Sequence, residues 1–98
     1  MLRVSYLFKG SDEDREEYVR EKFAPMLREL PDVRRVDIWR VTEVAVGEIR
    51  AGFIIDAWFD DENAMHTAFA SAEGRVVARE IIASEGKGME MIAAESLE

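Results

Sequence analysis

Alternation between apolar and polar positions predicts where the strands of this chain lie. Residues 2–8 and 53–59 alternate over their whole length, and residues 33–41 alternate from Val36 onward, which is typical of half-buried strands. The apolar positions of these strands are Val4, Tyr6, Phe8, Val36, Ile38, Phe53, Ile55, Ala57 and Phe59. Residues 89–95 are expected to give a fourth strand.

Two segments between the strands repeat apolar residues at helical spacing, one over residues 19–30 and one over residues 64–81. Ser11 is the expected N-cap of the first helix, with Asp14 in the approximate position of a capping box. Pro25 lies inside the first pattern and removes one backbone donor, so we expect a kink or a tighter last turn there.

The second helical region is interrupted by Ser-Ala-Glu-Gly at residues 71–74. Ser71 is expected to end one helix and to cap the next. A straight helix over residues 61–84 would be about 36 Å long, whereas a strand of seven residues spans about 23 Å. The bend therefore keeps both halves on the sheet, and residues 86–88 are expected to stop the second half.

The predicted order β-α-β-β-α-β indicates the α+β class, with a ferredoxin-like four-stranded antiparallel sheet and helices on one face. The 98 residues are expected to form one domain, residues 1–98. The face without helices would carry Ser5, Leu7, Asp37, Trp39, Val41, Ile54, Asp56, Trp58, Glu90 and Ile92. Because monomers rarely expose so large an apolar patch, we expect a homodimer whose two sheets enclose a cavity for a small apolar organic ligand.

Composition excludes several classes of function. Thirteen basic and twenty-one acidic residues give a net charge of −8, which repels phosphate backbones and argues against a nucleic-acid partner. The chain has no cysteine and one histidine, so we expect no metal site and no cofactor. The apolar runs are too short to cross a membrane and the first ten residues lack a secretory leader, so a cytoplasmic protein is expected.

Three stretches resemble the EthD-like family of the dimeric α+β barrel superfamily. FASAEGRVVAREI at residues 69–81 is similar to the family's Phe-x-Ser-Pro-Glu-Gly stretch. DAWFDDENAMHTAF at residues 56–69 looks like the family's third strand and the start of its next helix. YVREKFAPMLRELPDVRRVDI at residues 18–38 looks like its first helix and second strand. The similarity covers nearly the whole chain and implies a ferredoxin-like fold that dimerises into a barrel.

The chain departs from this family at one position of chemical interest. Many members carry a His-x-Pro step in the first helix, and the matching residues here are Phe23, Ala24 and Pro25. A phenylalanine carries no proton, so an acid–base role of that histidine does not transfer. Phe23 lies on the apolar stripe with Val19 and Leu27, which favours a core position; the alternative is an apolar lid on the cavity.

Candidate chemistry concentrates on the face without helices. Asp37 and Asp56 lie on adjacent predicted strands, and a carboxylate that lost hydration there could act as a catalytic base. The alternative is a pair of structural carboxylates, bound by arginines among Arg3, Arg35 and Arg40. Ligand contacts are expected from Ser5, Phe23, Trp39, Trp58 and Glu90. His66 is expected at an exposed helix flank and to be dispensable.

Three hypotheses of function follow from these features. The first is a homodimeric small-molecule-binding protein with a cavity between its sheets. The second, implied by relatives in fold, is a cofactor-independent enzyme of monooxygenase, cyclase or isomerase type that acts on a small apolar or aromatic substrate. The third is a structural or accessory dimer whose cavity is filled. Fold analogy alone does not choose among them.

Overall fold

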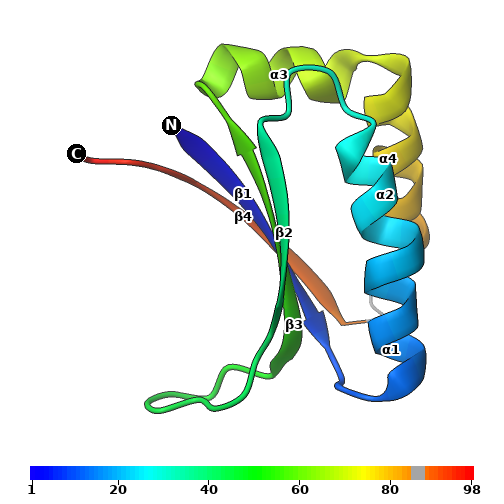
Figure 1. The fold of residues 1–98 in the computed structure, drawn as a ribbon, viewed down its shortest axis with the longest axis vertical. Helices are drawn as coiled ribbons and strands as arrows, with labels where there is room; N and C mark the ends of the chain where they lie inside the picture. Colours follow the sequence, from blue (N-terminus) through cyan, green and yellow to red (C-terminus); the bar gives the residue numbers. More distant parts are fainter. Residues whose placement is uncertain (85–87) are drawn as a thin grey trace.

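The computed structural model describes residues 1–84 and 88–98 and shows a sheet covered on one side by helices (Figure 1). The strands are β1 (Leu2–Lys9), β2 (Arg35–Arg40), β3 (Ala51–Phe59) and β4 (Met89–Glu95). The helices are α1 (Glu13–Tyr18), the π-helical segment η1 (Val19–Phe23), α2 (Ala24–Arg28), α3 (Glu62–Ala70) and α4 (Ala72–Ala83). Of the residues expected to stop α4, positions 86 and 87 lie outside the described residues.

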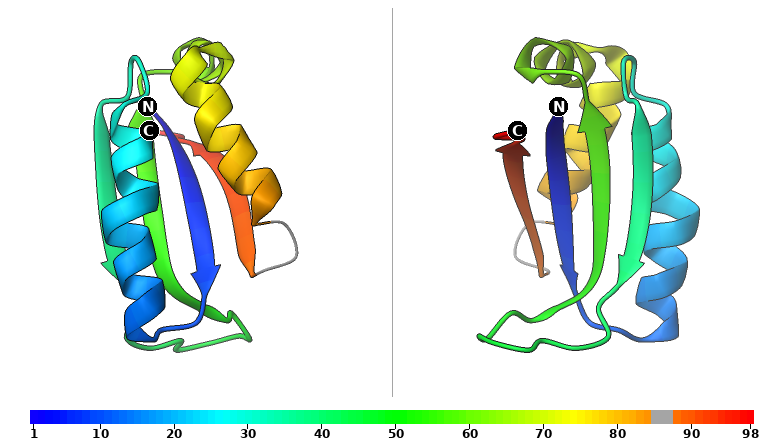
Figure 2. Two further views of the ribbon diagram at one scale, coloured as in Figure 1. Left: turned by 90° about the vertical axis from the view of Figure 1, so that its right-hand side faces the viewer. Right: turned by 60° about the vertical axis from the view of Figure 1, so that its left-hand side comes forward.

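The strands form one antiparallel sheet in the order β2-β3-β1-β4. The column of α1, η1 and α2 and the helix α4 lie against the same face, and α3 lies at one end of the sheet (Figures 1 and 2). The predicted α+β class, the four-stranded antiparallel sheet and the one-sided helical layer are therefore confirmed. Over the described residues, none of the helices is both long enough and apolar enough to span a membrane.

The hydrophobic core lies between the sheet and the helices. Its fully buried side chains include Val4, Tyr6, Phe8, Val19, Phe23, Leu27, Phe53, Ile55, Phe59 and Val77. The ring of Phe23 packs edge-on against Tyr6 and Phe8, with centroid separations of 5.1 and 5.2 Å. The predicted apolar faces of β1 and β3 are thus the faces that meet the helices, and the opposite face of the sheet is left open.

The first helical region contains a wider turn where a kink or a tighter turn was expected. The N–H of Ala24 donates to the carbonyl of Val19, five residues back, immediately before Pro25 in the first turn of α2. In a regular helix of 3.6 residues per turn, residues four apart drift around the axis. The wider turn counters this drift, so that Val19, Phe23 and Leu27 are all fully buried.

Side-chain caps fix the starts of α1, α3 and α4. The N-cap of α1 is Asp12, whose carboxylate accepts the N–H three residues ahead at 2.8 Å, so the cap predicted at Ser11 is wrong by one residue. Ser71 acts as predicted. Its Oγ donates to the Ala68 carbonyl at 2.5 Å and accepts the N–H of Gly74 at 3.0 Å. One side chain therefore ends α3 and begins α4.

Gly74 is required where α4 leaves α3. A Cβ at this position would lie 2.4 Å from the carbonyl oxygens of Ala68 and Phe69. We predict that Gly74→Ala lowers the free energy of unfolding by about 1–3 kcal/mol in urea denaturation, because the helix must shift to admit the methyl group. Arg79→Ala, at an exposed position of the same helix, should change it by less than about 0.5 kcal/mol. Equal stabilities of the two variants would contradict the close contact.

Both tyrosines of the chain lie on the helical side of the sheet. Burial raises the pKa of the Tyr18 hydroxyl to about 12, and the 2.6 Å hydrogen bond that it donates to Glu80 acts in the same direction. The same bond lowers the pKa of the Glu80 carboxyl. Burial also raises the pKa of Tyr6, whose ring is fully enclosed by the core.

These raised values predict a specific alkaline transition. An unfolded tyrosine loses its proton near pH ~10, so the two side chains contribute stability that is complete below about pH 10 and is lost as the pH rises toward 12. At about pH 10.5, the absorbance at 295 nm should show little phenolate while the circular dichroism stays native. At higher pH, phenolate should appear together with unfolding. Ionisation of either tyrosine near pH ~10 in a folded chain would contradict this prediction.

Candidate functional site

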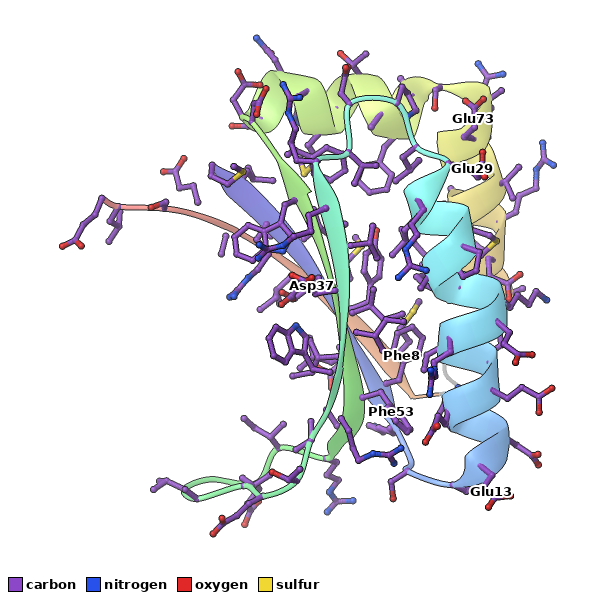
Figure 3. The ribbon with its side chains drawn as sticks, in the orientation of Figure 1. Phe8, Glu13, Glu29, Asp37, Phe53 and Glu73 are labelled. Carbon is purple, nitrogen blue, oxygen red and sulfur yellow. The ribbon has the colours of Figure 1, made fainter. Side chains whose placement is uncertain are left out.

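The open face of the sheet is organised in rows that run across the strands. Asp37 on β2 is directly opposite Asp56 on β3, and Asp56 is directly opposite Ser5 on β1. Figure 3 shows Asp37 on the side away from the helices, whereas Phe8 and Phe53 point into the helical layer. The predicted polar residues of three neighbouring strands are therefore brought together in one row.

Asp56 is the buried carboxylate of this face, next to the buried hydroxyl of Ser5. Asp56 is 6% exposed, and both of its carboxylate oxygens accept hydrogen bonds. The hydroxyl of Ser5 donates to Oδ1 at 2.5 Å and the indole Nε1 of Trp39 donates to Oδ2 at 3.1 Å. The Nε atom of Arg3 lies 4.0 Å from Oδ1. An ionised carboxylate is an acceptor only, and Asp56 serves as an acceptor in both bonds.

Asp37 has a matching environment at the adjacent strand. It accepts a hydrogen bond from the indole Nε1 of Trp58 at 3.1 Å and one from Arg35 at 2.8 Å. The ring of Trp58 lies between two guanidinium groups, with Arg35 at 4.9 Å and Arg3 at 5.6 Å from its centroid. Opposed carboxylates on paired strands repel each other, and these donors offset the repulsion.

The two aspartates and two tryptophans form a reciprocal arrangement that sequence reasoning did not predict. Each strand contains the pattern Asp-x-Trp, as Asp37-Ile38-Trp39 on β2 and Asp56-Ala57-Trp58 on β3. Because the aspartates are opposite each other in antiparallel strands, each tryptophan is the diagonal neighbour of the other strand's aspartate. Diagonal neighbours are within reach of long aromatic side chains. The repeated Asp-x-Trp pattern is the feature of the sequence from which these indole–carboxylate hydrogen bonds could have been predicted.

A hollow of about 500 Å³ lies over this part of the face. Its walls include Arg3, Ser5, Leu7, Trp39, Ile54, Asp56 and Ile92. Its volume is within the usual range of small-ligand sites, about 300–1,000 Å³. Ser5 and Asp56 therefore supply polar groups to a hollow with aliphatic and aromatic walls, which Arg40, Thr42 and Glu43 also line.

The remaining predicted site residues lie outside this hollow. Asp37 and Trp58 lie beside it, in the same sheet face, and Glu90 lines a neighbouring hollow of about 360 Å³ with Leu7 and Lys9. Phe23 is on the opposite side of the sheet, fully buried among core aromatic rings. Its expected ligand contact is therefore corrected, because the helical stripe that carries it faces the core.

Other polar residues are placed away from the hollow or at its rim. Arg40, considered as a partner for the aspartates, pairs instead with Glu16 on α1. His66 is exposed on α3, with Nε2 3.2 Å from a carboxylate oxygen of Glu62. Among the described residues, no group of three His, Asp or Glu side chains could hold a metal ion.

Comparisons with known proteins bear on the fold. No family model matches the chain and no curated protein matches its sequence. Its structure is similar to that of an EthD family protein from Bacillus halodurans, with a TM-score of 0.83, 19% identity and 99% of each chain covered. The ferredoxin-like fold implied by the resemblance in sequence is therefore confirmed.

Two further structures share this fold. One is a dimeric ferredoxin-like protein of unknown function from Jannaschia, with a TM-score of 0.69, 17% identity and coverage of 97% of this chain and 98% of that chain. The other is SnoaB, a cofactor-independent oxygenase from Streptomyces nogalater, with a TM-score of 0.62, 15% identity and coverage of 99% of this chain and 92% of that chain.

Proposed function

We propose that the chain is a single-domain, EthD-like protein of the cytoplasm that forms a homodimer and binds a small organic molecule in the hollow beside Asp56. The observation that carries the proposal is the buried carboxylate of Asp56 at the floor of a largely apolar hollow of about 500 Å³. Apolar walls with a few oriented polar groups are typical of small-molecule sites. The Ser5 and Trp39 hydrogen bonds hold that carboxylate in one orientation.

A second copy of the chain is the proposed cover of the open face. Trp39 and Ile92 are each more than half exposed there, at 53% and 54%. The loop of residues 41–50 and the C-terminal end extend past the sheet on this side (Figure 1), and they expose Val46, Ile49 and Leu97. Monomers rarely leave so much apolar surface in water. The dimeric state of the Jannaschia protein with this fold supports the same arrangement.

Ligand binding at this place can be observed through the indole groups. The chain has two tryptophans, and each indole N–H donates to an aspartate of the open face. A thermal-shift screen of small organic molecules should therefore give compounds that raise the melting temperature and move the Trp39 indole signal in ¹⁵N spectra. Compounds that raise the melting temperature while both indole signals stay unmoved would place the binding site elsewhere and contradict the proposal.

A cofactor-independent enzyme is the second candidate function. It is favoured by the 2.5 Å hydrogen bond between the Ser5 hydroxyl and buried Asp56, since a short bond to a carboxylate can position a proton beside a substrate. SnoaB shows that this fold accommodates an oxygenase without a cofactor. For any binding compound that is turned over, Asp56→Asn should reduce kcat by about 10²–10⁴-fold and leave the dimer intact. Turnover that survives this substitution would remove Asp56 from the chemistry.

A further inference from the structure

Arg3 differs from Arg34, Arg35 and Arg40 in lacking a hydrogen-bonded carboxylate. Arg34 is paired with Asp60 at 2.6 Å and Arg35 with Asp37 at 2.8 Å. The carboxylate nearest to Arg3 is Asp56, 4.0 Å from its Nε atom, a distance too long for a hydrogen bond. Arg3 thus carries a positive charge at the wall of the hollow without a hydrogen-bonded counterion among the described residues.

The carboxylate of Asp56 already accepts hydrogen bonds from two other side chains. Ser5 holds its Oδ1 atom and Trp39 holds its Oδ2 atom, and the residue is almost fully buried. The terminal nitrogens of Arg3 make no hydrogen bond within the described part of the chain, and its side chain is 42% exposed. They can therefore receive an acceptor that enters the hollow from solvent.

The guanidinium of Arg3 contacts an aromatic ring. Its guanidinium lies over the Trp58 ring, 5.6 Å from the centroid, and Arg35 lies over the same ring at 4.9 Å. An arginine stacked on an aromatic ring keeps its planar set of N–H donors available at the edge. A carboxylate can bind such an edge through two parallel hydrogen bonds.

We infer that the ligand of this hollow is an aromatic carboxylate, an inference that rests on the proposed small-molecule function. The carboxylate binds the free edge of Arg3, and the ring lies against the apolar walls formed by Leu7, Trp39, Ile54 and Ile92. The other charged wall residues do not offer a second cationic site of this kind, because Arg40 is paired with Glu16 and the remaining two, Glu43 and Asp56, are acidic. Because the net charge of −8 of the chain opposes the approach of an anionic ligand, a local cation at the wall favours its binding.

The test compares two probes of the same shape, 2-naphthoate and 2-naphthamide. Each is titrated into the ¹⁵N-labelled protein while the Trp39 and Trp58 indole signals are followed. The carboxylate should bind at least about tenfold more tightly than the amide, since hydrogen bonds to charged groups are stronger than neutral ones. Arg3→Gln should remove that preference and leave the affinity for the amide unchanged. Arg35→Gln is the matched control, because Arg35 stacks on the same ring but is paired with Asp37, and it should retain the preference.

Three results would overturn the inference. Equal affinity of the wild-type protein for the two probes would show that the hollow binds neutral molecules, and the proposed binding function would then stand without an anionic ligand. Binding of neither probe would exclude aromatic carboxylates as ligands. The proposed small-molecule function would then still be tested separately by the thermal-shift screen. Weaker dimerisation of Arg3→Gln with an unchanged preference for the carboxylate would assign Arg3 to the contact between copies. The comparison of probes on the wild-type protein remains decisive even if Arg3→Gln fails to fold.

Discussion

Replacement of Phe23 by alanine is expected to lower the free energy of unfolding by about 3–5 kcal/mol, the usual cost of deleting a buried aromatic ring. The side chain is fully buried and contacts the rings of Tyr6, Phe8 and Tyr18. The π-helical turn holds it in line with Val19 and Leu27, so the backbone has little freedom to close the resulting cavity. Urea denaturation at one fixed protein concentration measures the effect, because dissociation of a dimer would otherwise contribute to it.

Phe23→Leu serves as the control for this prediction. It retains much of the volume and should cost less than about 1.5 kcal/mol if the core repacks around it. Because Phe23 lies across the sheet from the hollow, Phe23→Leu should also leave binding at the open face unchanged. Loss of ligand binding in a variant of normal stability would restore the lid role that the structure argues against.

Replacement of Ile92 by glutamate is expected to raise the dissociation constant of the dimer by at least about 100-fold, or about 2.7 kcal/mol. Ile92 is 54% exposed on the open face and lines the hollow. In a symmetric dimer the same surface of both copies is used, so each dimer would bury two unpaired carboxylates. Buried charges without partners are strongly unfavourable. Sedimentation equilibrium over a range of concentrations gives the dissociation constant.

Ile82→Glu provides a matched control for the dimer prediction. Ile82 is 68% exposed on α4, in the helical layer on the other side of the sheet. The same chemical change at this position should leave the dissociation constant within about threefold of the wild-type value. If Ile82→Glu dissociated the dimer and Ile92→Glu did not, the contact between copies would lie on the helices.

The sequence patterns that predicted the fold correctly are those in which one physical effect determines the local structure. Alternation placed the apolar faces of β1 and β3 against the helices because burial of one sheet face outweighs local preferences. Ser71 was recognisable as a junction because its hydroxyl satisfies backbone groups at the end of one helix and the start of the next. Such local hydrogen bonds depend on residue type and spacing, which are visible in a sequence.

Features that depend on three-dimensional fit were predicted less well. The N-cap was predicted at Ser11 and is Asp12. Both residue types can cap a helix, and the path of the chain after β1 decides between them. The wide turn before Pro25 allows Val19, Phe23 and Leu27 to be buried together. This is a requirement of tertiary packing, which the helix propensities of single residues do not describe. The hydrogen bonds of Asp56 depend on strand register, because a shift by one residue would move its side chain to the other face.

The candidate site was therefore only partly visible in the sequence. The residues Ser5, Trp39 and Asp56 were expected on the open face and now line one hollow. Glu90 was expected with them but lies at a neighbouring hollow, and its partner across the strands, Leu7, lines both hollows. The part proposed for Arg3 depends on interatomic distances that a sequence does not show, since its nearest carboxylate already accepts hydrogen bonds from Ser5 and Trp39.

The mass of the wild-type protein in solution tests the central claim most directly, because the proposed site needs a second copy to close it. Sedimentation equilibrium at roughly 10 µM, a concentration well above the dissociation constant of a stable dimer, should give about twice the chain mass of 11.2 kDa. Addition of a compound that raises the melting temperature should leave that mass unchanged. A single species of 11.2 kDa at this concentration would contradict both the covered face and the enclosed hollow.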